Sequence, residues 1–175
     1  MKQNTCEVLG GTLVPLFIYG EWDVEVFRAD GSIEHKTLRN TVTANGMNRL
    51  ANRAVQAAGT TPFFTIIVGS ITTAPADTDA QAQFGEMIRK SFIATGASAQ
   101  SREWVFGACT LGGAADGLTS KTMACAGLTD FATSHASTGI YANRVNGLGV
   151  TLADSDFLAL TVRIRVGSHN QAHTT

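Results

Sequence analysis

Apolar residues alternate with polar or small residues from Leu158 to Val166. Successive side chains of a strand point to opposite faces, so this alternation predicts a strand with one buried and one wet face. A similar alternation from Glu21 to Phe27 places Trp22, Val24 and Val26 on one face and three acidic residues on the other. In the C-terminal strand, the residues expected to face inward are Leu158, Leu160, Val162, Ile164 and Val166.

The residues after Phe27 predict a hairpin. Ala29-Asp30-Gly31 carries the Asp-Gly signal of a tight turn, and residues 32–38 return as the partner strand. Because Glu34, His35 and Lys36 are polar, we expect this return strand to be largely exposed. Further strands are expected at Phe63–Val68, near Ser91–Ala94, and at Ser101–Thr110, Thr122–Leu128 and Gly139–Val145.

One stretch has the periodicity of a helix instead. The apolar residues Met47, Leu50, Ala51, Ala54, Val55 and Ala58 recur at the spacing of one helical face. This pattern predicts a short amphipathic helix at about 46–58. Thr43 and Asn45 both have side chains that accept a hydrogen bond from an amide of a first helical turn, and Gly59 supplies a stop.

Short strands with turn residues between them and a single helix are typical of a mainly β protein. We predict a β-sandwich or jelly-roll-like domain over residues 21–167. In residues 1–20, Pro15 cannot donate to a central ladder, so an N-terminal arm and a local edge strand both stay open. Residues 168–175 are expected to form a polar C-terminal tail. A length of 175 residues suits one such domain.

The composition indicates a folded protein with little long-range charge. Hydrophobic residues make up 44% of the chain, charged residues 15%, and the formal net charge is −1. This balance disfavours direct binding to nucleic acid or to an anionic membrane, and we expect neither partner. No apolar run approaches the ~18 residues of a membrane span, and the first residues lack the apolar core of a signal peptide. We therefore expect synthesis in a reducing cytoplasm.

The cysteines and histidines form no metal-binding pattern. Cys6, Cys109 and Cys125 cannot all pair within one chain, and none lies at metal-ligand spacing from another. We expect buried reduced thiols, and an intermolecular bond to any of them stays open. Asp77 and Asp79 look like half of a calcium loop, but its glycine and closing glutamate are missing. The histidines without ligand partners at workable spacing are His35, His135, His169 and His173.

The common catalytic motifs are also missing from the sequence. It contains no Cys-x-x-Cys, no His-Glu-x-x-His, no phosphate-binding Gly-x-x-x-x-Gly-Lys and no Gly-x-Ser-x-Gly elbow. Gly147-Leu148-Gly149 lacks the third glycine of a dinucleotide loop, and we interpret it as a turn. Trp22 and Trp104 lie in alternating strands, where tryptophan is more often a core or interface residue than a ligand platform. We predict a non-enzymatic protein without catalytic, cofactor-binding or metal-ligating residues.

Several motifs follow one another between Glu21 and Val166. After the hairpin, Asn40, Thr43, Gly46, Met47, Leu50 and Ala51 fit the helix start Asn-x-x-Thr-x-x-Gly-hydrophobic-x-x-Leu-Ala. Residues 64–69 and the loop Thr72–Asp79 are similar to a Tyr-Ile-Ala-Val-Gly strand with a Thr-Thr-Ala-Pro-x-x-x-Asp loop. Then come Glu86 and Arg89, Gly127-Leu128, Ala142-Asn143-Arg144 and the closing strand. This order resembles a family of small structural proteins of tailed double-stranded DNA bacteriophages, although Cys125-Ala126 stands where that family often has Glu-Val.

The resemblance implies a virion component without enzymatic activity or a cofactor. The leading expectation is a capsid decoration or cement protein on the capsid surface. Its partners would be the major capsid protein shell and copies of itself, as a dimer or trimer. The alternative is a tail-fibre, baseplate or collar subunit of the tail. A third expectation is a host-surface carbohydrate-binding module that uses Trp22 or Trp104.

Overall fold

A computed structural model describes residues 16–44, 46–48, 65–76, 84–91, 97–98, 103–129 and 141–168. These residues form one antiparallel sheet with the strand order β4-β3-β7-β8-β2-β1-β9-β6-β5. The strands are β1 (Leu16–Phe27), β2 (Ile33–Val42), β3 (Thr65–Gly69), β4 (Glu86–Ser91), β5 (Ala97–Ser98), β6 (Glu103–Gly112), β7 (Thr122–Thr129), β8 (Tyr141–Thr151) and β9 (Phe157–Ser168). The prediction of a mainly β protein is confirmed.

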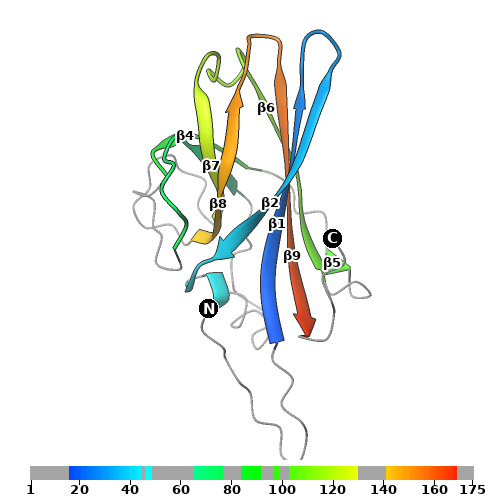
Figure 1. The fold of residues 1–175 in the computed structure, drawn as a ribbon, viewed down its shortest axis with the longest axis vertical. Coiled ribbons are helices and arrows are strands. Elements are labelled where there is room, and N and C mark those ends of the chain that lie inside the picture. The colour runs from blue at the N-terminus through cyan, green and yellow to red at the C-terminus, as the bar shows by residue number, and fades with distance from the viewer. Residues whose placement is uncertain are drawn as a thin grey trace, which may run out of the picture.

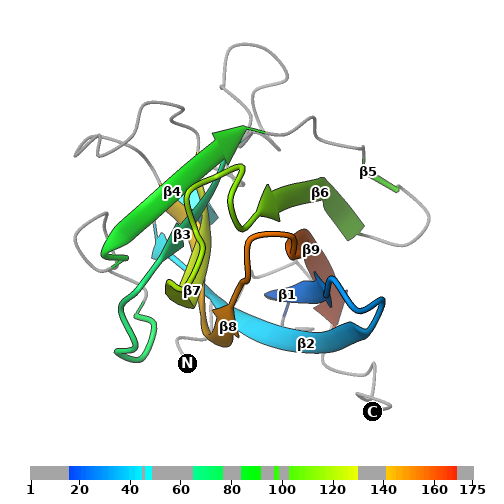
Figure 2. The same ribbon diagram turned by 90° about the horizontal axis from the view of Figure 1, so that it is seen from above.

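The sheet folds over itself at β2. This strand pairs with β1 from Ile33 to Asn40, but with β8 only at Thr41 and Val42. The strands β4, β3, β7 and β8 therefore form one layer, and β2, β1, β9 and β6 form the other (Figure 1). Seen from above, the two layers face each other around a common interior, as the predicted β-sandwich requires (Figure 2).

The core lies between the two layers. The second layer contributes Trp22, Val24 and Val26 from β1, and the first contributes residues such as Ile66 and Leu128. Burying each large apolar side chain contributes ~1.5–3 kcal/mol. The predicted inward face of β9 is confirmed, with fully buried Leu158, Leu160, Val162 and Ile164, whereas the side chain of Val166 lies outside the described part of the chain.

The predicted hairpin is also confirmed. β1 and β2 are joined by a turn in which the amide of Arg28 donates to the carbonyl of Ser32 over 2.9 Å. Gly31 has a φ of 86°, which glycine adopts without steric cost. The amide and hydroxyl of Ser32 both donate to the Asp30 carboxylate, at 2.9 and 2.7 Å. As expected, Glu34 and His35 are exposed.

Two strand positions differ from the prediction. β4 spans Glu86–Ser91, so only Ser91 of the strand expected near Ser91–Ala94 lies in it, and residues 92–94 lie outside the described part of the chain. Most positions of β4 are partly buried, so no alternation marks this strand in the sequence. β8 extends to Thr151 and runs through the predicted turn at Gly147-Leu148-Gly149. Here Met123 pairs with Val150 and Cys125 with Asn146, so the three residues form a bulge in β8. The positive φ angles of Gly147 and Gly149 serve a bulge as well as a turn.

The predicted helix start is seen only in its first residues. Ala44 and Gly46–Asn48 are helical, and the amide of Gly46 donates to the hydroxyl of Thr43 over 3.0 Å. Thr43 is therefore the cap that the sequence predicts, while Asn45 and most of the 46–58 segment lie outside the described residues. β1 already begins at Leu16, within the predicted arm. The other residues of that arm, 1–15, and the tail residues 169–175 also lie outside the described residues.

Candidate interaction surface

Several of the residues that carry the resemblance lie close together on the β4-β3-β7-β8 layer, around Phe84. Arg144 on β8 is fully buried there, and its Nη2 donates to the carbonyl of Thr73 over 3.0 Å. The Arg144 guanidinium carbon lies 5.5 Å from the centre of the Phe84 ring. On β4, Arg89 and Glu86 form a buried ion pair at 2.9 Å. Arg144 therefore fastens the loop after β3 to the sheet, whereas the Glu86–Arg89 pair lies within β4, where pairing offsets the cost of burying two charges.

A glycine makes room for this fastening. Gly127 on β7 pairs with Arg144, and a Cβ at Gly127 would lie 2.3 Å from the Phe84 ring. The missing side chain lets the ring lie flat over β7, where it forms a small apolar cluster with Ile67 and Cys125. Arg144, Arg89 and Gly127 therefore belong to the framework of the domain, whereas Thr72, Thr73 and Ala74 of the loop motif are exposed.

The thiols that the structure describes are buried and free. Cys109 and Cys125 form no disulfide, which confirms the prediction for these two residues, and Cys6 lies outside the described residues. Burial raises the pKa of Cys109 to about 11 and also raises the pKa of Cys125. A thiol with a raised pKa holds little thiolate at neutral pH and is a poor nucleophile.

The tryptophan and histidine candidates that the structure describes do not form a ligand or metal site. Trp22 is fully buried in the core and presents no ring to a ligand, and the side chain of Trp104 lies outside the described part. His35 is exposed on β2. Within the described residues no group of three or more His, Cys, Asp or Glu could hold a metal ion, and no helix could span a membrane. The candidates outside those residues are His135, His169, His173, Asp77 and Asp79.

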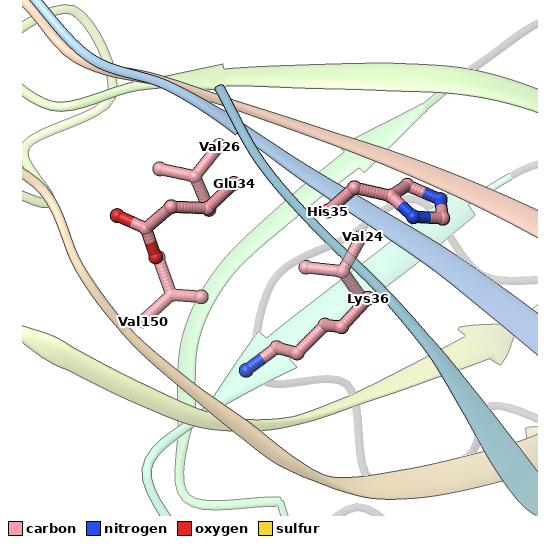
Figure 3. Close-up of a pocket in the computed structure, with 6 residues that line it drawn as sticks. All are labelled: Val24, Val26, Glu34, His35, Lys36 and Val150. Carbon is pink, nitrogen blue, oxygen red and sulfur yellow. The ribbon is translucent and has the colours of Figure 1, made fainter. Parts of the chain in front are cut away.

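A small hollow lies where β2 and β8 diverge. It measures about 90 Å³ and has an apolar floor that includes Val24 and Val150. Figure 3 shows Glu34 and Lys36 on one side of β2 and His35 on the other. The Lys36 ammonium donates to the carbonyls of Gly147 and Leu148 across the gap. The hollow holds a few waters at most, and a charged side chain that spans the gap opposes the addition of a foreign strand.

A different surface stands out on the outer face of the second layer. Among the described residues, the exposed large hydrophobic side chains are Phe27, Ile33 and Phe157, with exposed fractions of 37%, 61% and 48%. Strand register puts Phe27 directly opposite both Ile33 on β2 and Phe157 on β9. We call these three residues the apolar row.

On the neighbouring strand β6, a glycine borders the apolar row. Phe157 pairs with Gly112, and a Cβ built at Gly112 would lie 3.5 Å from the Phe157 ring. This is an ordinary van der Waals distance, so the Phe157 ring lies beside Gly112. Three adjacent strands thus present one continuous apolar surface at the hairpin end of the sheet. Gly112 on a fourth strand, β6, borders this surface.

A buried carboxylate fixes the position of the apolar row. Asp156 accepts hydrogen bonds from the amides of Ala153 and Ala29, at 2.9 and 3.1 Å, and from the Arg28 guanidinium at 2.8 Å. The backbone N–H of Ala153, followed by Arg28, holds the pKa of Asp156 below its usual 3.8. Because Arg28 follows Phe27 and Asp156 precedes Phe157, this contact locks the two aromatic residues of the apolar row together.

The sequence pattern does not single out the apolar row. Phe27 closes one alternating run, Ile33 opens the next, and Phe157 precedes the predicted strand. Single exposed apolar residues are normal on a protein surface, so none of the three is informative alone. The signal available was the hairpin itself, because a tight turn at Ala29–Gly31 sets Phe27 opposite Ile33.

Comparisons with protein-family models, with curated proteins and with solved structures find no match for this chain. Its class is therefore defined by its own fold and surface. The chain forms a mainly β, sandwich-like domain whose outer sheet face carries an apolar row.

Proposed function

We propose that the chain is a structural component of a bacteriophage virion, a capsid decoration or cement protein that binds the major capsid protein shell and stabilises it. The observation that carries this proposal is the apolar row, in which the exposed large hydrophobic side chains of the described residues lie side by side. Clustered apolar side chains on an otherwise polar surface mark a site of protein contact. The choice of the capsid shell as the partner rests on the resemblance to phage structural proteins.

A cement protein can bind its shell through a small apolar surface, because the same contact is repeated many times. One modest apolar contact gives weak binding to an isolated partner. When many copies bind a repeating shell, each copy is held by several neighbours at once, and the effective affinity rises without any new contact. A rigid sandwich with a fixed apolar row supplies this repeated contact.

Copy number tests the proposal. A cement protein would occur in purified virions in numbers comparable with the shell protein, whereas a tail-fibre, baseplate or collar subunit would occur in a handful. Quantitative mass spectrometry of purified virions, with the major capsid protein as the internal standard, measures the ratio. A few copies per particle would support the tail alternative, and absence from the particle would refute a virion role altogether.

A further inference from the structure

We infer that the apolar row docks into an apolar depression with a basic rim on the shell protein, and that it does not join two copies of this chain. This inference rests on the proposed function and names the chemistry of the partner surface. It is carried by the area of the apolar row and by the charges around it.

The area of the apolar row is too small to hold a free dimer. With 37%, 61% and 48% of their surfaces exposed, Phe27, Ile33 and Phe157 together offer roughly 300 Å². A stable interface between two proteins buries about 800 Å² on each partner. The apolar row therefore forms the centre of a contact, and the polar surface around it must match the same partner.

The charges around the apolar row are acidic. Glu25 is exposed on β1 two residues before Phe27, Asp30 is exposed in the hairpin turn, and Asp154 is exposed in the turn that leads to Phe157. The hydrogen bonds from Ser32 lower the pKa of Asp30, so its carboxylate stays ionised. A partner of opposite charge is favoured at such a rim.

The nearest cation in the sequence is already neutralised within the domain. The Arg28 guanidinium donates to Glu34 at 2.7 Å and to Asp156 at 2.8 Å. Among the described residues, Glu25, Asp30 and Asp154 place three exposed carboxylates at this end of the sheet, and Lys121 beside β7 adds an exposed cation, so the balance of charge is acidic. Lysine and arginine side chains around an apolar depression complement this pattern.

The same charges argue against a second copy as the occupant. A two-fold dimer centred on the apolar row would bury the same surface of both copies, so the rim of one copy would meet the rim of the other. The three carboxylates of one chain would then face those of the other, and like charges at close range oppose association. An acidic rim therefore selects for a partner other than the chain itself.

The test measures binding to empty shells assembled from the major capsid protein of the same phage. Wild-type protein is compared with Phe27→Ser/Phe157→Ser and with Ile33→Ser, which removes the most exposed of the three side chains. Arg39→Ser is the matched control, because Arg39 is exposed on the same face of β2, six residues from Ile33. Thermal melting establishes that each variant is folded before binding is measured.

We expect wild-type protein to bind the shells and the double variant to bind about 30-fold more weakly, as for the loss of central contact residues. Ile33→Ser should lose about 5-fold, and Arg39→Ser should stay within about 2-fold. Glu25→Lys/Asp154→Lys should weaken binding about 10-fold, and added salt should reduce the difference between this variant and the wild type.

The possible outcomes distinguish a failure of the proposed function from a failure of this inference. If wild-type protein does not bind shells, the proposed function fails and this inference fails with it. If wild-type protein binds and the double variant binds equally well, the proposed function stands and the inference is wrong. If sedimentation shows a wild-type dimer that the double variant abolishes, the apolar row joins two copies and the inference is overturned.

Discussion

At the scale of single residues, Asp156 is the clearest determinant of local order. Its carboxylate joins the end of β1 to the turn between β8 and β9 through Arg28, Ala29 and Ala153. Local sequence signals marked the Thr43 cap and the turn at Asp30, because the partners of these two side chains lie a few residues away. The partners of Asp156 on the hairpin are 127 and 128 residues distant, and no local pattern reports them.

Replacing Asp156 by asparagine should lower the thermal unfolding temperature by a few degrees at about pH 7. An amide offers one acceptor oxygen, so at least one of the donors of Arg28, Ala29 and Ala153 loses its partner. Asp154→Asn is the control, since Asp154 lies in the same turn but is exposed and accepts from the Thr119 hydroxyl. Equal effects of the two variants would contradict the role given to Asp156.

The same variant gives a signed pH dependence. The pKa of Asp156 in the folded protein lies below the ordinary value of 3.8, so its stabilising effect is complete above that value. The effect is lost as the pH falls through the folded-state pKa. The difference in unfolding temperature between wild type and Asp156→Asn should therefore shrink from about pH 7 to about pH 3. A difference that grows in acid would show the opposite linkage.

At the scale of elements, strands with an alternating or a continuous apolar pattern were predictable, including β3 and β7, which are buried on both faces, but the position of β4 was not. In β1 and β9, charged residues alternate with large apolar ones, so the two kinds lie on different faces of the sheet. The inward faces of both strands were predicted correctly. β4 carries the buried pair Glu86–Arg89, and polarity alone puts both residues at the surface. The burial of Arg144 was equally hidden, because it depends on Phe84 and Thr73 from other elements.

A charge on the inward face of β9 should prevent folding. Leu160→Asp and Val162→Asp each bury an unpaired carboxylate among fully buried neighbours, at an expected cost of more than about 4 kcal/mol. Thr110→Asp is the matched control, because Thr110 is exposed on the neighbouring strand β6. Soluble yield and thermal melting measure the effect. A Leu160→Asp protein that is soluble and melts like the parent would refute the assigned core.

The contact between β2 and β8 can be tested through Lys36. Lys36→Met keeps the apolar stem but removes the ammonium that binds the carbonyls of Gly147 and Leu148. We expect the free energy of unfolding to fall by about 1 kcal/mol, and amide exchange near the bulge in β8 to accelerate. Lys121→Met, at an exposed turn position, should change neither quantity measurably. Urea unfolding and hydrogen exchange provide the two readouts.

At the scale of the whole molecule, composition and strand spacing were enough to predict a sandwich, but not its strand order. The order requires β2 to be shared between the layers, which follows from two residue pairs at its end, Thr41 with Arg144 and Val42 with Asn143. The apolar row depends on this order as well, because Phe27 and Phe157 are far apart in sequence and meet through the pairing of β1 with β9. A surface of this kind becomes visible only when the register is known.

The pairing of β1 with β9 has one more consequence. Leu16 pairs with Ser168 at one end of these strands, and Phe27 pairs with Phe157 at the other. With a rise of ~3.3 Å per residue, the two ends lie roughly 35 Å apart. A reporter or antigen fused beyond Leu16 or beyond Ser168 would therefore be attached at the end of the sheet opposite Phe27. While Phe27 is bound to its partner, the fused protein would face away from the binding site.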